Sequence, residues 1–118
     1  MIAVQRSSSD WFVTPEKVQA AVQRLIEVAA PNRLYLFGSC ARGDTNANSD
    51  LDVLVVVDDS VTSPREESVR LRQALRGIQM PMDILVVTQT FFNAHRNSPG
   101  LVYREIVETG RLVYERAA

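Results

Sequence analysis

Residues 34–52 read LYLFGSCARGDTNANSDLD, and this stretch carries most of the information about the fold. Its first four residues are apolar or aromatic, which is typical of a short buried strand, and Gly38-Ser39 predicts a sharp turn after it. Residues 43–49 consist of turn-forming residue types and predict a loop. Because this connection is too short for a full crossover helix, we expect the strands on either side of it to run antiparallel.

Helical and strand patterns alternate outside this stretch. Thr14, Pro15 and Glu16 are suited to the N-cap and first turn of a helix, while Gly77 and Gly110 are suited to helix C-termini. The predicted elements, in chain order, are helix 15–29, strand 34–37, strand 51–57, helix 64–76, strand 82–87, a short helix capped by Thr88, a helix opened by Ser98-Pro99 and closed by Gly110, and a short strand at 112–114. This order predicts an α/β (α+β) fold in which helices flank a mixed sheet.

Length and composition predict one folded domain. The chain has 118 residues, of which 46% are hydrophobic and 23% charged, close to the average for globular proteins. We expect residues 1–12 to form a polar tail and residues 13–118 to form the domain. Lys and Arg number 13 against 14 Asp and Glu, so no basic excess exists to neutralise the phosphates of an extended nucleic acid.

Cysteine and histidine usage favours a reducing compartment. Cys40 and His95 are the single representatives of their types, which excludes an intrachain disulfide and a zinc-type Cys/His cluster. We expect Cys40 to be a small packed residue and His95 to be a surface or capping residue. The first ten residues lack the pattern of a signal peptide, and no apolar run approaches the length of a membrane span. The expected location is therefore the cytoplasm.

Three aspartates precede or begin apolar strand segments. Asp50 and Asp52 are two residues apart, so strand alternation places both carboxylates on one face of the sheet. Asp83 has the corresponding position at the start of the next predicted strand, and it joins them if the two strands are neighbours. Adjacent anions at the edge of a core are costly without a cation, and carboxylate oxygens are ligands that suit Mg²⁺. Three carboxylates around two metal ions are typical of displacement reactions at phosphorus.

The Gly38-Ser39 turn supplies features that suit a phosphate group. A strand that ends in Gly-Ser and turns into a short helix presents backbone N–H groups and a hydroxyl to an anion, and glycine permits its close approach. Arg42, three residues after Ser39, could add a positive charge beside a triphosphate.

Together these residues resemble the signature of the polymerase-β-like nucleotidyltransferase superfamily, and in particular its minimal nucleotidyltransferase (MNT) branch. That signature is Gly-Ser, ten residues, then Asp-x-Asp, commonly with Ala-Arg-Gly after the Gly-Ser. The matching positions here are Gly38, Ser39, Ala41, Arg42, Gly43, Ser49, Asp50 and Asp52. Asp83 matches the third carboxylate of the family by its place before an apolar strand.

The resemblance implies a reaction and a set of roles. Gly38 and Ser39 would hold the phosphates of ATP, Asp50 and Asp52 would ligate Mg²⁺, and Asp83 would complete the metal site or accept the proton of the attacking hydroxyl. In the minimal branch the acceptor is typically a tyrosine of a helical HEPN toxin, and transfer of AMP from ATP with release of pyrophosphate makes the nucleotidyltransferase the antitoxin of the pair. That partner is inferred from family analogy and from no residue in this chain.

Structural roles are alternatives for each site residue. Asp50 and Asp52 could be ordinary strand-edge aspartates, and Asp83 could simply begin a strand. Arg42 could pair with Asp44 or another surface acid, a contact of little energetic value.

Two other functions compete with the enzymatic antitoxin. The chain could be a binding module that blocks its partner by occlusion without needing catalysis. It could instead be a small-molecule nucleotidyltransferase that completes its site by forming a homodimer. Trp11, Phe12 and the exposed faces of the last helices are candidate contact surfaces, although core packing explains them equally well.

Overall fold

The computed structural model describes residues 12–42 and 50–117, apart from the side chains of Cys40 and Arg42. The predicted loop 43–49 and residues 1–11 of the predicted tail, including Trp11, lie outside the described residues. The helices are α1 (Pro15–Ala29), α2 (Ser39–Arg42), α3 (Pro64–Ala74), α4 (Gln89–His95) and α5 (Val102–Thr109), and the strands are β1 (Arg33–Phe37), β2 (Leu51–Val57), β3 (Met82–Thr88) and β4 (Arg111–Glu115). This is the predicted order of elements, and the terminal strand is confirmed.

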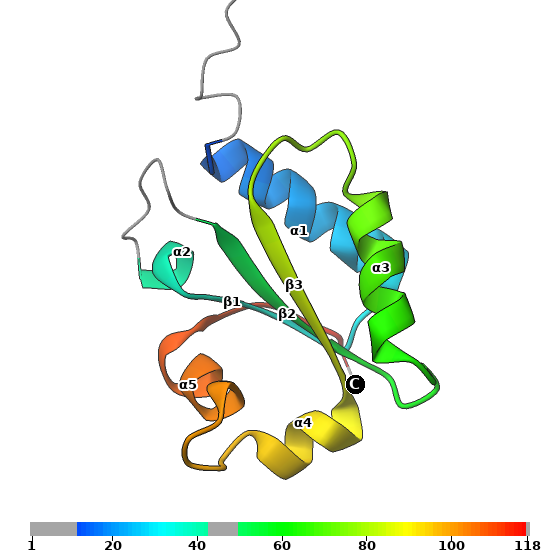
Figure 1. Ribbon diagram of the computed structural model, residues 1–118, viewed down its shortest axis with the longest axis vertical. Helices are drawn as coiled ribbons and strands as arrows, with labels where there is room; N and C mark the ends of the chain where they lie inside the picture. Colours follow the sequence, from blue (N-terminus) through cyan, green and yellow to red (C-terminus); the bar gives the residue numbers. More distant parts are fainter. Residues whose placement is uncertain (1–11, 43–49, 118) are drawn as a thin grey trace, which may run out of the picture.

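The strands form one mixed sheet in the order β3-β2-β1-β4. Strands β1 and β2 pair antiparallel, as the short connection between them predicted, and β2 pairs with β3 in parallel. Helices α1 and α3 lie on one side of the sheet, and α4 and α5 lie on the other (Figure 1). The α+β fold class is therefore confirmed. None of the helices in the described part of the chain has the length and apolar character needed to span a membrane.

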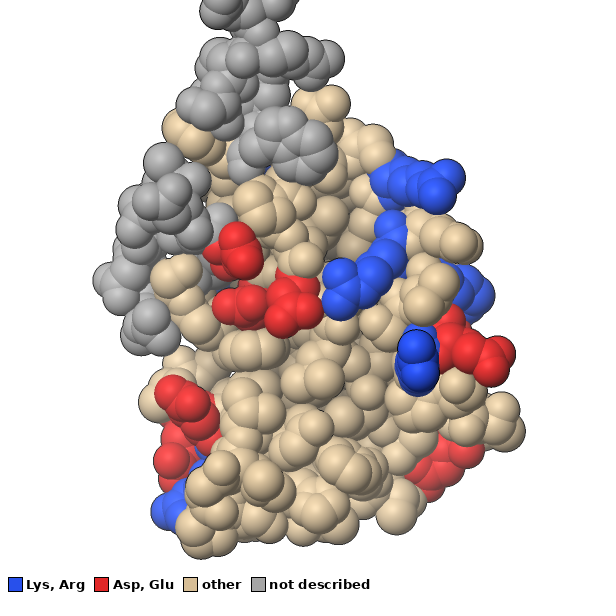
Figure 2. Space-filling model, in the orientation of Figure 1, with Lys and Arg blue, Asp and Glu red and all other residues tan. Residues whose placement is uncertain are grey.

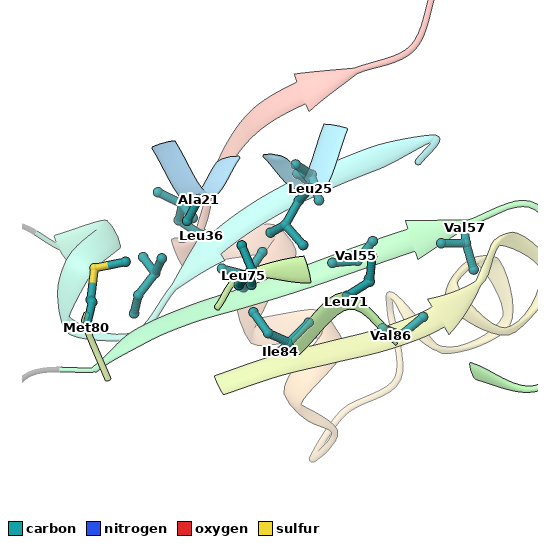
Figure 3. Close-up of a cluster of buried hydrophobic side chains, with 13 residues drawn as sticks. Ala21, Leu25, Leu36, Val55, Val57, Leu71, Leu75, Met80, Ile84 and Val86 are labelled. Atoms are coloured by element: carbon teal, nitrogen blue, oxygen red, sulfur yellow. The ribbon is translucent and has the colours of Figure 1, made fainter. Parts of the chain in front are cut away.

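Strand β2 contributes to the core on both faces of the sheet. Val53, Val55 and Val57 pack in the cluster beneath α1 and α3, which includes Leu25 and Leu71 (Figure 3). The alternate residues Leu54 and Val56 pack in a second cluster, with Tyr35 of β1, Phe92 of α4 and Ile106 of α5. A strand that is buried on both faces explains why the sequence of β2 is almost continuously apolar.

Two predicted helix ends differ from the structure. Helix α3 stops at Ala74, and its C-cap is Leu75, whose N–H reaches the carbonyl groups of Leu71 and Arg72. The prediction that α3 continues to residue 76 and is capped by Gly77 was wrong, because these hydrogen bonds tighten the last turn before Gly77. That glycine, with φ of 95°, lies in the turn that follows.

The start of α5 also differs from the prediction. Ser98-Pro99 does not open this helix, which begins at Val102 with Leu101 as an N-cap that makes no side-chain hydrogen bond. Gly100, with φ of 83°, lies in a left-handed turn that separates Ser98-Pro99 from α5. At the other end, Gly110 closes α5 as predicted, since its N–H donates to the carbonyl of Ile106 at 2.8 Å.

Candidate active site

The register of β2 and β3 places Asp52 directly opposite Asp83. The two strands are parallel, so both aspartates lie at the N-terminal end of their strand. Because side chains alternate along a strand, Asp52 shares the sheet face of Leu54, which is the face covered by α4 and α5. The strand adjacency on which the role of Asp83 depended is therefore present.

The three predicted carboxylates influence one another electrostatically. Burial raises the pKa of Asp52 above its usual value, and the neighbouring charges of Asp83 and then Asp50 raise it further. Asp52 is half-buried, whereas Asp50 and Asp83 are exposed. Figure 2 shows acidic side chains gathered on the molecular face over β2 and β3. The structure thus brings together Asp50, Asp52 and Asp83, which are separated by up to 33 positions in the sequence.

Gly38 makes a close approach to Asp52. Strand β1 ends at Phe37, and Gly38 follows with φ of 72°, a left-handed conformation that side chains disfavour. A Cβ atom at this position would overlap Oδ2 of Asp52. The backbone angle therefore favours glycine here, and any side chain at this position would also displace the carboxylate of Asp52. Ser39 begins α2 directly after it, as the sequence predicted.

Arg42 is the last residue of α2, and its side chain lies outside the described part of the structure. Its predicted contact with a triphosphate, and the alternative pairing with Asp44, therefore stay predictions.

A second arginine at the site was missed by the sequence reasoning. Nη2 of Arg72, on α3, lies 3.3 Å from Oδ1 of Asp83 and 3.3 Å from the carbonyl oxygen of Ile84. Figure 2 shows a basic side chain beside the acidic group. The available signal was topological: a helix that connects two parallel neighbouring strands runs back along the sheet, so its last turn lies beside the start of the next strand.

Helix α5 completes a small cavity beside Asp52, which the sequence reasoning also did not anticipate. The cavity measures about 190 Å³ and is lined by Phe37, Gly38, Asp52, Val102, Glu105, Ile106 and Thr109. It joins the predicted phosphate-binding turn to a predicted metal ligand. A larger cavity of about 520 Å³ lies along α1, β1 and β4, but it contains none of the predicted site residues, so size alone does not identify the site.

The donor chemistry of this site fits Mg²⁺, because the three carboxylates supply hard oxygen ligands. Within residues 12–42 and 50–117, however, no three His, Cys, Asp or Glu side chains are grouped so that they could hold a metal ion. The ion pair between Asp83 and Arg72 gives one of the three carboxylates a different cationic partner.

The solved structures that resemble the chain include the following two. One is a crystal structure of a toxin-antitoxin with AMP-PNP, with a TM-score of 0.58 and 22% identity over 83% of this chain and 73% of the other. The second is a candidate nucleotidyltransferase from Sulfolobus solfataricus, with a TM-score of 0.46 and 19% identity over 88% of this chain and 91% of the other. At these identities the first likeness establishes a shared fold, and the second adds no argument.

The curated proteins contain no match to the chain. The family model described as "Polymerase beta, Nucleotidyltransferase" matches residues 16–118, which include every predicted site residue and nearly all of the described fold. The chain therefore belongs to the polymerase-β nucleotidyltransferase family.

Proposed function

We propose that the chain transfers AMP from ATP to a hydroxyl group of a partner protein in a Mg²⁺-dependent reaction. The observation that carries this proposal is the register of β2 and β3, which sets Asp52 opposite Asp83 while Gly38 approaches Asp52 from β1. A half-buried carboxylate held beside two others serves no evident packing purpose, because like charges in contact destabilise a fold. The same geometry suits a site at which a cation and phosphate groups bind together.

The residues divide the reaction between them. The backbone at Gly38 and Ser39 would bind the phosphate groups of ATP. The acceptor oxygen would attack the α-phosphorus, the bond from that phosphorus to the bridging oxygen would break, and pyrophosphate would leave with the bonding electrons. Asp83 is exposed and could accept the proton of the acceptor hydroxyl. Mg²⁺ would be held by Asp50 and Asp52, with Asp83 completing the site, and it would supply charge stabilisation at the phosphate oxygens.

The partner proposed is a helical HEPN toxin, with a tyrosine as the acceptor and the present chain as the antitoxin. Support comes from the Gly-Ser, Ala-Arg-Gly and Asp-x-Asp positions that resemble the minimal branch of the family. The fold shared with a toxin-antitoxin that was crystallised with AMP-PNP agrees with this proposal. A homodimer acting on a small molecule and a non-catalytic antitoxin are the alternatives to be tested.

Mass spectrometry of the partner tests the proposal. A helical protein encoded beside this chain is incubated with it, ATP and Mg²⁺, and a mass gain of one AMP located on a tyrosine is expected. The double substitution Asp50→Asn with Asp52→Asn should abolish this gain. Competition between ATP and the other nucleoside triphosphates in the same assay reports the base preference.

Neutralisation of the co-expressed partner separates the alternatives. If the doubly substituted protein still protects cells from the partner, occlusion replaces catalysis as its role. If AMP is found on a small molecule and never on the partner, the chain is a small-molecule nucleotidyltransferase, and both antitoxin hypotheses are wrong.

A further inference from the structure

Arg72 is held at the edge of the carboxylate site by the packing of α3. The preceding residue, Leu71, is completely buried in the core between α3 and the sheet, which fixes the orientation of the helix. The Arg72 side chain is 48% exposed and extends over the start of β3. Its Nη2 donates to two acceptors of adjacent residues, Oδ1 of Asp83 and the carbonyl oxygen of Ile84, each at 3.3 Å.

The guanidinium and a metal ion would both be drawn to the negative charge of Asp83, and Arg72 contacts one of its two oxygen atoms, Oδ1. Asp83 also contributes to the negative charge around Asp52. An ionised carboxylate can accept from an arginine and bind a metal ion together, but the guanidinium has then already neutralised part of the negative charge that attracts the ion.

We propose that Arg72 is a resident counter-cation, which competes with a divalent ion for the negative charge of Asp83 when the ion binds to the carboxylates. Arg72 is therefore a positioning residue that acts through Asp83 and lowers the affinity of the nucleotide-free site for divalent metal. This inference rests on the proposed function, since it assigns Asp83 to the metal site. It concerns metal binding before any transfer, so it can be tested without measuring activity.

The experiment measures Mn²⁺ binding to the full chain, freed of metal, from the electron paramagnetic resonance signal of unbound Mn²⁺. Arg72→Ala should bind Mn²⁺ about two- to fivefold more tightly than the wild type, which corresponds to the range of an exposed ion pair. Arg72→Lys keeps the charge but loses the planar fork, so its affinity should fall between the two. In about 1 M salt, where the screening length is about 3 Å, the ratio between wild type and Arg72→Ala should shrink toward one.

Arg70→Ala is the matched control. It removes the same charge from the same helix, but Arg70 pairs with Glu67, not with a site carboxylate. Its Mn²⁺ affinity should equal that of the wild type. A second control uses the Asp83→Asn background, in which Arg72→Ala should produce no further change because the competition has already been removed.

Three results would overturn the role of Arg72: unchanged or weaker Mn²⁺ binding by a folded Arg72→Ala protein, equal tightening by Arg70→Ala, or a full effect of Arg72→Ala in the Asp83→Asn background. If Arg72→Ala does not fold, Arg72→Gln is measured under the same criteria. Failure of the proposed function has a different signature. In that case no AMP is found on the partner, whatever the Mn²⁺ affinities of the wild type and of Arg72→Ala.

Discussion

The two ends of the β2–β3 pair have the same backbone arrangement and opposite chemistry. At the start of the pair, Asp52 faces Asp83, and Asp50 adds a third negative charge. Further along the same register, Val55 faces Val86 and Val56 faces Val87, and all four side chains are buried. The same parallel pairing thus includes an apolar end, which stabilises the fold, and an acidic end, where like charges destabilise it.

The difference indicates which end serves stability and which serves chemistry. Burial of the apolar end removes hydrocarbon surface from water and stabilises the pairing, because side chains of different size are closely packed on both faces and would fit poorly after a shift of register. That register then holds the aspartates together at the other end despite their repulsion. Substitutions at the two ends should therefore have opposite consequences for stability and for activity.

Asp52→Asn should produce the largest effect on activity. We expect transfer of AMP to fall by at least about a thousandfold, which corresponds to about 4 kcal/mol of lost transition-state stabilisation. Without metal, the free energy of unfolding should stay equal or rise, because one of three repelling charges has been removed. Rate measurements and urea denaturation of the same preparation check both halves. If Asp52→Asn lost stability as well as activity, the conclusion that the acidic end serves chemistry and the apolar end serves stability would be contradicted.

Leu54→Ala should have the reverse profile. Leu54 is completely buried in the cluster on the α4 and α5 face, so its truncation should lower the free energy of unfolding by about 2–5 kcal/mol. The rate per folded molecule should stay close to that of the wild type. Urea denaturation checks the free energy of unfolding. The transfer rate, divided by the folded fraction at a temperature where the variant remains folded, checks the activity.

Gly38→Ala tests the contact between β1 and Asp52. Both Gly38 and Gly77 have positive φ, and alanine in that conformation costs about 1–2 kcal/mol. Only at Gly38 would the added Cβ meet the Asp52 carboxylate, whereas nothing lies within 4 Å at Gly77. Gly77→Ala is therefore the matched control. Gly38→Ala should lose more stability than the control and, because the carboxylate is displaced, about a hundredfold in transfer rate.

The pH dependence of stability should separate Asp52 from the other aspartates, and this is the smallest expected effect. The pKa of Asp52 is raised by folding, so its contribution to stability is complete below its unfolded pKa and is lost as the pH rises through its folded pKa. The advantage of Asp52→Asn over the wild type should therefore grow with rising pH in metal-free buffer. The pKa values of Asp58 and Asp59 are lowered instead. Because the wild type and Asp52→Asn both contain these two aspartates, their contributions cancel in the difference between the stabilities of the two proteins. A difference that is constant with pH would contradict the assignment.

Local sequence patterns predicted most of the fold. Strand β2 was predicted with its observed bounds because six of its seven residues are aliphatic and only Asp52 is polar, and β1 was predicted to within one residue. The errors lie at helix ends. Ser98-Pro99 is a typical helix start, but Gly100 introduces a turn before α5, and the tight last turn of α3 ends that helix before Gly77. In both cases the backbone of a following turn outweighed a local residue preference.

The sequence by itself determined that Gly38 and Ser39 follow a strand and that Asp50 and Asp52 lie at the start of the next strand, because both depend on neighbours within a few residues. Only the tertiary structure decided that Asp83 lies opposite Asp52, that Arg72 pairs with Asp83, and that α5 lines the cavity beside Asp52. Those relations depend on which strands pair and how the helices pack across the sheet. That arrangement is set by the burial of side chains that are distant in sequence, so no local pattern contains it.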